Sequence, residues 1–401
     1  MENNKYYDFG YAKFGPLLWG YSHWLIDNIV ERRINKVFFF SRDGLIMQKA
    51  FNLISGSEKI ECRYLEVSRR SLRVPVLWKD LSFENLLTML SPSEAISIQS
   101  IFDGIGLAIS LYVDKIQKYG FSTNTVFYRS EILKNQNLMS MYKELCVDIK
   151  NNSLIEYELL KKYLAQNNVH GKFAVVDIGW SGGMQRFLQT TLNTMGIDNE
   201  IFGFYTGIAS YYKRNTSIEK LNLNGYLFDF SHDKSAVDRR SSYVGLYELL
   251  FLETRGSVKN YTEDKNGKIV AVRYPYEYAD GKGITEEAKC IGIVQTAALD
   301  YVKTKEINNA VIPTKMELCK PLINAGSRPS SEALKLFADF RFFDEGVYNY
   351  LARPKNLIYY LFHPSRLKKD FYASRWKTGF LRRLFKVPFS YQLLYNFLKR
   401  L

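Results

Sequence analysis

Cysteine and histidine are scarce in this sequence, which has four of each among 401 residues. No two cysteines form a C-x-x-C pair and the histidines show no metal-ligand spacing, so we expect neither a disulfide framework nor a zinc site. Scattered free cysteines are typical of a reducing compartment and favour a cytoplasmic protein. The residues concerned are Cys62, Cys146, Cys290, Cys319, His23, His170, His232 and His363.

Long apolar runs are also missing. The longest stretch without Asp, Glu, Lys or Arg is 14–26, thirteen residues, whereas a membrane-spanning helix needs about 20 apolar residues. The N-terminus, Met1–Lys5, lacks the apolar run of a secretory signal. A hydrophobic content of 46% and an aromatic content of 15% still supply a large core, which excludes a disordered chain. At about 150 residues per domain, the length predicts two to three domains.

Acidic residues are scarce at the C-terminal end. Residues 364–401 contain ten Lys or Arg against one acid, a net +9, so the rest of the chain supplies only +5 of the total +14. A nucleic-acid-binding protein more often carries a basic stripe on its folded body, so no nucleic-acid partner is expected. Aromatic side chains are mixed with these cations. Helical periodicity around 379–386 predicts either an amphipathic contact with an anionic membrane or an ordinary helix packed on the body.

Strand-like and helix-like patterns alternate over residues 1–235. The alternation predicts an α/β, Rossmann-like core with a mostly parallel sheet and a helical insertion at about 82–165. Residues 236–350 predict a helix and hairpin subdomain, and 351–401 a basic, aromatic tail. The expected strands span 36–40, 64–67, 172–176 and 201–208; the expected helices span 14–33, 45–53, 184–193, 243–252 and 285–304; a hairpin over 258–272 turns at Asn266-Gly267.

The first strand ends in the polar motif Ser41-Arg42-Asp43-Gly44. Ligands of open α/β sheets bind at the carboxyl ends of the strands, so polar sequence at this point indicates a binding site. Arg42 offers a fixed cation, Asp43 an acceptor or base, and Gly44 a backbone that comes close to a ligand. A plain turn in which Asp43 caps the next helix is the alternative.

The second strand leads into three arginines, Arg69, Arg70 and Arg73. The planar, two-pronged guanidinium group suits phosphate, so the segment predicts a phosphate-binding site. A solvated charged face is the alternative, but the apolar neighbours Val67 and Leu72 disfavour it.

The third strand ends at Asp177 and leads into a glycine-rich loop. The free N–H groups of the helix that follows favour an anion, so the loop predicts a second phosphate site; a structural turn is the alternative. The Walker A and Gly-x-Gly-x-x-Gly patterns are absent, so no nicotinamide or flavin is expected. The candidate binding residues of the loop are Gly179, Trp180, Ser181, Gly182, Gly183 and Gln185.

Farther along the chain, Glu248 and Arg255 lie around the end of a predicted helix. Glu248 is a candidate general base and Arg255 a candidate substrate contact, although surface side chains are the commoner explanation. The residue pattern assigns no metal ligands.

Three stretches together resemble a known family. They are 14–20 leading to 37–44, then 64–75, then 176–182. In this order they are similar to the glycan phosphoribosyltransferase domain of bacterial ribofuranosyltransferases, over residues 14 to about 260. In that family the domain is commonly fused behind a haloacid-dehalogenase-type phosphatase.

The resemblance implies that a 5-phosphoribosyl group is transferred from phosphoribosyl diphosphate to a glycan acceptor in capsule or O-antigen synthesis. We expect the acceptor to be lipid-linked and the anomeric carbon to be inverted. The arginines would then neutralise phosphates, and the glycine-rich loop would cradle one of them. Asp43 or Asp177 would hold ribose hydroxyls or a metal, or deprotonate the acceptor. Mg²⁺ is the candidate cofactor because it bridges diphosphate oxygens.

The chain departs from the fused arrangement of that family. No Asp-x-Asp phosphatase loop precedes the transferase-like segment, and Ser41 stands where that loop has its nucleophilic Asp. We therefore expect a separate phosphatase partner that removes the 5-phosphate. The basic residues of 364–401 make the inner face of the cell membrane a candidate contact. Two alternatives stay open: a haloacid-dehalogenase-like phosphohydrolase, and a non-catalytic scaffold of a polysaccharide-assembly complex.

Overall fold

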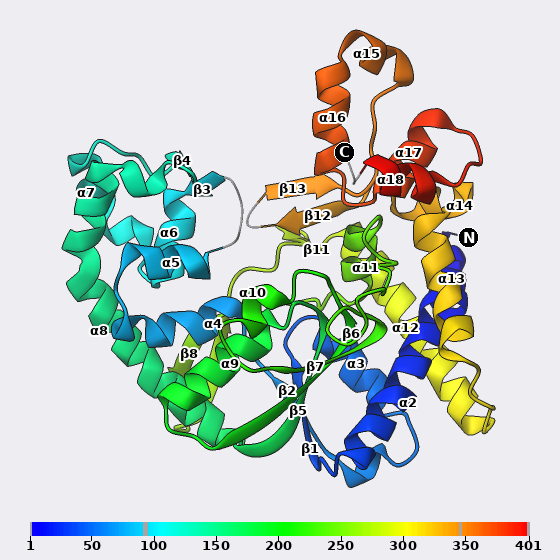
Figure 1. Ribbon diagram of the computed structural model, residues 1–401, viewed down its shortest axis with the longest axis horizontal. Coiled ribbons are helices and arrows are strands. Elements are labelled where there is room, and N and C mark those ends of the chain that lie inside the picture. The colour runs from blue at the N-terminus through cyan, green and yellow to red at the C-terminus, as the bar shows by residue number, and fades with distance from the viewer. Residues whose placement is uncertain (1, 91–94, 345–346, 399–401) are drawn as a thin grey trace.

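The centre of the protein is a five-stranded sheet with the strand order β2-β1-β5-β6-β7 (Figure 1). The computed structural model describes residues 2–90, 95–344 and 347–398. All four pairings within the sheet are parallel, which confirms the predicted α/β fold. The strands are β1 (Lys36–Phe40), β2 (Glu61–Leu65), β5 (Gly171–Trp180), β6 (Asn199–Ile208) and β7 (Asn222–Asp229).

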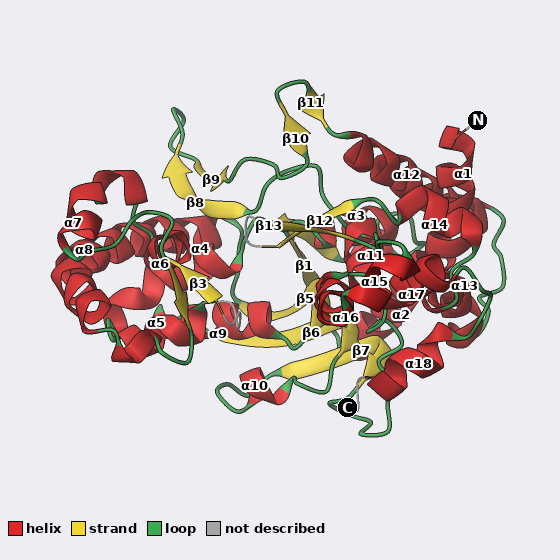
Figure 2. Cartoon of the chain, turned by 90° about the horizontal axis from the view of Figure 1, so that it is seen from above, coloured by secondary structure: helices red, strands yellow, loops and turns green. Residues whose placement is uncertain are grey.

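Helices cover both faces of the sheet (Figure 2). Along β1, Val37 and Phe39 point into one core, whereas Phe38 and Phe40 point into the other. The strand is an uninterrupted apolar run because a parallel strand is buried on both sides. One face carries α2 (Gly15–Glu31), α3 (Gly44–Phe51), α11 (Val244–Leu250), α12 (Glu286–Ile307) and α13 (Lys315–Ser327); the other carries α4 (Arg69–Arg73), α8 (Gln136–Gln166), α9 (Gly183–Thr194) and the hairpin of β8 (Val258–Glu263) and β9 (Ile269–Arg273).

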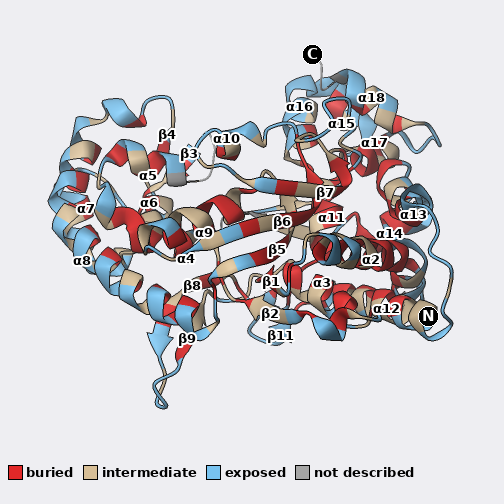
Figure 3. Cartoon of the chain, turned by 60° about the horizontal axis from the view of Figure 1, so that its bottom comes forward, coloured by how far each residue is buried: buried red, intermediate tan, exposed pale blue. Residues whose placement is uncertain are grey.

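The helical insertion has a core of its own beside the sheet (Figure 3). The 31-residue helix α8 belongs to both cores, because Leu145 and Ile149 lie in the insertion while Leu160 and Leu164 pack against the sheet. One continuous helix thereby fixes the insertion to the sheet. The other elements of the insertion are α5 (Phe83–Met89), β3 (Ala95–Ser97), α6 (Ile98–Ile105), α7 (Val113–Lys118) and β4 (Val126–Tyr128).

The C-terminal helices pack on the core that α2 covers. The Trp376 ring is fully buried, and its Nε1–H donates to the Gly326 carbonyl at 2.7 Å. Burial lowers the pKa of Lys377 to about 7. The stretch 379–386 belongs largely to α17 (Lys377–Phe385), a helix packed on the body, and contact with a membrane stays a prediction.

The two C-terminal regions expected from the sequence, 236–350 and 351–401, both contribute side chains to this same core. Among the described helices, none is long and apolar enough to cross a membrane. The further elements are α1 (Glu2–Phe9), α10 (Lys213–Thr216), β10 (Ala279–Asp280), β11 (Gly283–Ile284), α14 (Ser331–Phe337), β12 (Arg341–Asp344), β13 (Val347–Tyr350), α15 (Leu357–Phe362), α16 (Pro364–Ala373) and α18 (Tyr391–Leu398).

The position of α8 against the sheet makes a matched pair of leucine substitutions informative. Leu160→Ala removes a fully buried side chain and should lower the free energy of unfolding by about 2–5 kcal/mol. Leu111→Ala, at a side chain that is 79% exposed, should change it by less than about 0.5 kcal/mol. Urea denaturation followed by circular dichroism measures both, and equal effects would contradict the packing of α8 on the sheet.

Candidate active site

The chain changes its direction of travel across the sheet between β1 and β5. From β1 it moves to β2 on one side, and from β2 it crosses back to β5 on the other. Ligands of open α/β sheets bind at such a switch point, outside the carboxyl ends of the strands. Asp43 follows β1, and Asp177 lies in β5 one residue past the paired Phe39 and Val176. Both predicted carboxylates therefore lie at the switch point.

The carboxyl groups of Asp43 and Asp177 are coupled by burial and like charge. Burial and the charge of Asp177 raise the pKa of Asp43 well above its ordinary value, against the opposing charge of Arg42. Burial raises the pKa of Asp177 to about 6, although the Ile178 N–H donates to its Oδ1 at 2.9 Å and Arg69 opposes the rise. Both side chains keep some solvent exposure, so a ligand can reach them.

A third carboxylate, Glu248, reaches the same place from α11. Its charge adds to the rise in the pKa of both Asp43 and Asp177. Trp180, the last residue of β5, donates its Nε1–H to Glu248 Oε1 at 2.8 Å. The Arg240 guanidinium lies 3.6 Å from the centroid of the Trp180 ring. The structure thus brings the three predicted catalytic carboxylates together and adds Arg240, a cation that no sequence motif marks.

The turn after β1 is held by residues from distant parts of the chain. Arg42 has a positive φ of 72°, which is unusual for a residue with a side chain. Its N–H donates to the Tyr64 hydroxyl at 3.0 Å and to Glu253 Oε2 at 3.3 Å, and its guanidinium pairs with Glu277 at 3.0 Å. The Ser41 hydroxyl donates at 2.5 Å to a backbone carbonyl just after β2. Both predicted binding residues of the turn are therefore engaged within the protein, and a ligand competes with Glu277 for Arg42.

Asp43 precedes α3 without capping it, because its described contacts include no hydrogen bond from an N–H of the first turn. The capping alternative is therefore set aside, and the carboxylate is available to the site. Gly44 has a packing role, since a Cβ there would lie 3.0 Å from the Phe39 carbonyl carbon. Gly44 therefore allows α3 to pack closely against β1, whereas its predicted role was to let a ligand approach the backbone.

Of the three arginines after β2, the structure places Arg69 beside the carboxylates. It is exposed at the start of α4, and its charge opposes the rise in the pKa of both aspartates. Arg70 instead forms a two-pronged ion pair with Glu156, at 2.9 Å for each contact. The Arg73 guanidinium lies 4.0 Å from the centroid of the Phe187 ring. Arg70 and Arg73 therefore hold α4 to α8 and α9, and the predicted phosphate-binding segment is reduced to Arg69.

The glycine-rich loop is in part the end of β5 itself, because the pairing with β6 continues to Trp180. Gly179 and Gly182 have positive φ values of 107° and 72°. A Cβ at Gly179 would lie 2.6 Å from Tyr205 Cβ, and one at Gly182 would lie 2.7 Å from Leu223 Cδ2. These two glycines are required for the close packing of the strand ends, whether or not a ligand binds.

The other predicted residues of the loop divide between the site and the interior. Ser181 Oγ accepts a hydrogen bond from Asn215 Nδ2 at 3.0 Å. Gln185 is buried and accepts the Tyr205 hydroxyl at 2.8 Å, so the prediction that it binds substrate gives way to a structural role. Gly183 opens α9, and a Cβ there would meet nothing closer than 3.7 Å.

A partly buried ion-pair network lies beside the turn that carries Arg42. Arg273 pairs with Glu253 at 2.8 Å and with Glu66 at 2.7 Å, and the Tyr64 hydroxyl donates to Glu253 Oε2 at 2.6 Å. The predicted Arg255 lies at the exposed rim, 3.4 Å from Glu66. Sequence reasoning missed Arg273 because it closes an ordinary hairpin strand, and only the fold brings its partners together.

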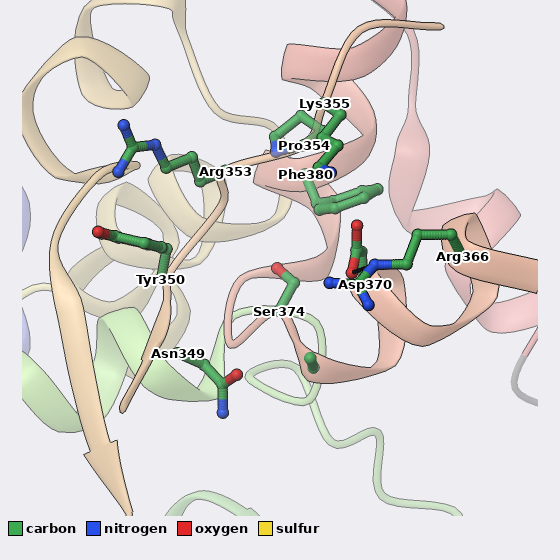
Figure 4. Close-up of a pocket in the computed structure, with 10 residues that line it drawn as sticks. Asn349, Tyr350, Arg353, Pro354, Lys355, Arg366, Asp370, Ser374 and Phe380 are labelled. Carbon is green, nitrogen blue, oxygen red and sulfur yellow. Dashed lines mark ion pairs between the residues drawn. The ribbon is translucent and has the colours of Figure 1, made fainter. Parts of the chain in front are cut away.

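Two surface depressions lie elsewhere on the described chain. One of about 370 Å³ is formed by the C-terminal region (Figure 4), and one of about 380 Å³ lies along β7. Neither of these two depressions is lined by Asp43 or Asp177, and the candidate site is identified by the electrostatic interaction of the carboxyl groups at the switch point. Within the described residues, no group of three or more His, Cys, Asp or Glu side chains is arranged to hold a metal ion.

No protein-family model matches this chain, and no curated protein matches it. The resemblance to glycan phosphoribosyltransferases therefore stays a prediction, and the function is argued from the geometry of the switch point.

The raised pKa of Asp177 predicts that Asp177→Asn stabilises the protein in a pH-dependent way. The folded state holds this proton more tightly than the unfolded state, where the carboxyl has an ordinary pKa of 3.8. Stability from this group is therefore complete below about pH 4 and is lost as the pH rises through about 6. Asp177→Asn removes that loss and should raise the free energy of unfolding by about 1–3 kcal/mol near neutral pH.

Urea denaturation near pH 4 and near pH 7.5 measures the gain, which should vanish at about the lower value. Asp198→Asn, at an exposed carboxylate just before β6, is the matched control and should change stability at neither pH. A gain of the same size at both pH values would show that the Asp177 carboxyl titrates normally.

Proposed function

We propose that this protein is a cytoplasmic glycosyltransferase that moves a 5-phosphoribosyl group from phosphoribosyl diphosphate to a hydroxyl of a lipid-linked glycan. One observation carries the proposal: the coupled carboxyls of Asp43 and Asp177 share the switch point of the sheet with Arg69. A ribose with phosphate at both ends needs cations for its phosphates and polar groups for its hydroxyls, and this edge of the sheet offers both. The resemblance of residues 14 to about 260 supports the same reading.

The donor fits at the ends of β1 and β5. Arg69 is exposed and free to rotate towards a phosphate group. The first turn of α9, which begins at Gly183, has backbone N–H groups that suit the second phosphate. Asp43, whose pKa is raised well above its ordinary value by burial and the charge of Asp177, lies where a ribose hydroxyl would be held.

The transfer requires one base. The acceptor oxygen forms a bond to C1 of the ribose while the bond from C1 to the diphosphate oxygen breaks, and the diphosphate leaves with that electron pair. The hydroxyl proton passes to Asp177, whose pKa of about 6 leaves it largely ionised near neutral pH yet basic enough to accept a proton. Glu248, fixed by Trp180, stabilises the positive charge that develops on the ribose ring. Attack from the side opposite the diphosphate inverts the anomeric carbon.

Mg²⁺ fits this arrangement as a companion of the diphosphate. Proteins usually hold magnesium with one or two carboxylates together with substrate phosphates. A cation at the switch point relieves the repulsion that raises the pKa of Asp43, so Asp43 would hold the ion in its ionised form. When bound, the ion neutralises charge on the leaving diphosphate.

The two alternatives find less support at the site. A haloacid-dehalogenase-like phosphohydrolase needs a nucleophilic Asp where this chain has Ser41, whose hydroxyl is held by the Val67 carbonyl. A scaffold does not require a carboxyl pair whose repulsion destabilises the fold. The proposed transfer leaves the 5-phosphate on the product, so a separate phosphatase would act next.

Release of pyrophosphate from phosphoribosyl diphosphate tests the proposal. We expect release only when a lipid-linked glycan acceptor is present, and a loss of more than about 100-fold in kcat/KM for Asp177→Asn, because the base is removed. Arg69→Gln should lower kcat/KM by about 10–100-fold, because a charge-assisted phosphate contact is lost. Arg328→Gln, at an exposed arginine after α13, is the control and should keep full activity.

Each alternative has its own outcome in the same assay. Release of inorganic phosphate without any acceptor indicates hydrolysis. Full activity in both Asp177→Asn and Arg69→Gln would place the active site elsewhere. No turnover with any glycan acceptor favours the scaffold.

A further inference from the structure

Two consecutive helices, α15 and α16, protrude from the body of the protein between β13 and α17 (Figure 1). α15 has four exposed apolar side chains that share one face: Leu357, Ile358, Leu361 and Phe362. They form two adjacent pairs whose members are four residues apart, and residues four apart lie on the same side of a helix. Leu361 and Phe362 are 71% and 78% exposed. Large apolar side chains gathered on an exposed face mark an interaction surface.

The finger formed by α15 and α16 is anchored on its other side. Tyr360 is buried, and its hydroxyl donates to Asp370 Oδ2 at 2.9 Å. Arg366 pairs with Asp370 at 2.9 Å, and the rings of Phe371 and Phe380 pack with their centroids 5.8 Å apart. The exposed apolar face takes no part in these contacts, so folding does not account for its apolar character.

The surface around the finger is basic. Residues 353–372 contain five Lys or Arg and one acid, a net +4, and the single acid is the paired Asp370. Lys368 and Lys369 are exposed on α16. A depression of about 370 Å³ at the root of the finger is lined by three of these five cations (Figure 4). These are Arg353, Lys355 and Arg366.

We propose that the finger docks on the surface of an anionic phospholipid bilayer. Leu361 and Phe362 enter the boundary between headgroups and acyl chains, and the surrounding cations contact lipid phosphates. The cations favour a bilayer over a protein as the partner. An apolar groove on a protein would bind the apolar side chains alone, whereas an anionic bilayer binds the apolar side chains and the surrounding cations. α15 has six residues and is about 9 Å long, so the patch that enters the boundary is small.

The finger overlaps the basic segment 364–401 that the sequence indicated, since α16 lies within it, and adds the apolar face of α15 before it. The periodicity around 379–386 pointed to α17, whose apolar face is buried against the body. The finger lies immediately before α17, and α15 has four exposed large apolar side chains where α17 has Phe385. The inference stands independently of the proposed transfer reaction.

Co-sedimentation of the purified full chain with vesicles tests this surface. We expect binding to vesicles of equimolar phosphatidylglycerol and phosphatidylcholine, and binding at least about tenfold weaker to phosphatidylcholine alone, since the cations gain only from anionic lipid. Leu361→Ser/Phe362→Ser should weaken binding to the anionic vesicles by about tenfold or more. Lys368→Gln/Lys369→Gln should weaken it by a similar factor, about tenfold.

Two control variants remove the same kinds of side chain elsewhere. Ile307→Ser/Val311→Ser changes two exposed apolar residues at and beyond the end of α12, and Lys134→Gln/Lys150→Gln changes two exposed lysines of the helical insertion. Both should bind anionic vesicles as the wild type does, and thermal melting checks that every variant is folded. The proposal is overturned if the wild type stays in the supernatant with anionic vesicles, or if the finger variants bind as well as the controls.

Discussion

The repulsion between the carboxyl groups of Asp43 and Asp177 is the interaction on which the candidate site depends. The sheet places both at its switch point, and burial there raises the pKa of each. Such strain persists only where surrounding structure enforces it. The turn before Asp43 shows this enforcement. Tyr64 holds Arg42 at a positive φ, and distant segments supply the other contacts of Arg42. The positive charge of Arg69 opposes the repulsion between the two carboxyl groups. Because Arg69 is exposed, water screens this charge and the repulsion is relieved only in part.

Much of the fold could be predicted because its strongest signals are local. The apolar run 36–40 was assigned as a strand with the bounds it has in the structure, and the hairpin turn at Asn266-Gly267 was also correct. The strand β7 was missed, because Asn222, Asn224 and Gly225 give it the polar, glycine-containing pattern of a loop. It is an edge strand with one neighbour, where the sheet places fewer demands on apolar residues.

The site could be predicted in part, for a related reason. The order of the parallel strands brings Asp43 and Asp177 together, and strand-end position is readable from the sequence. The different roles of Arg69 and Arg70 could not be predicted from the sequence. The two residues are neighbours in one motif, and only their tertiary contacts distinguish the site residue Arg69 from the structural residue Arg70. Arg70 meets Glu156 from a helix 86 positions away. Arg240 was missed for the same reason, because its stacking on Trp180 exists only in the folded chain.

Carbon-13 NMR of the aspartate carboxyl carbons, titrated with pH in the absence and presence of phosphoribosyl diphosphate, tests the central claim most directly. Spectra of Asp43→Asn and Asp177→Asn assign the two signals. The account predicts that Asp177 titrates near pH 6 in the free protein, that Asp43 titrates well above its ordinary value, and that the donor shifts both signals. Two carboxyls that titrate near the ordinary value of 3.8 and do not respond to the donor would contradict it.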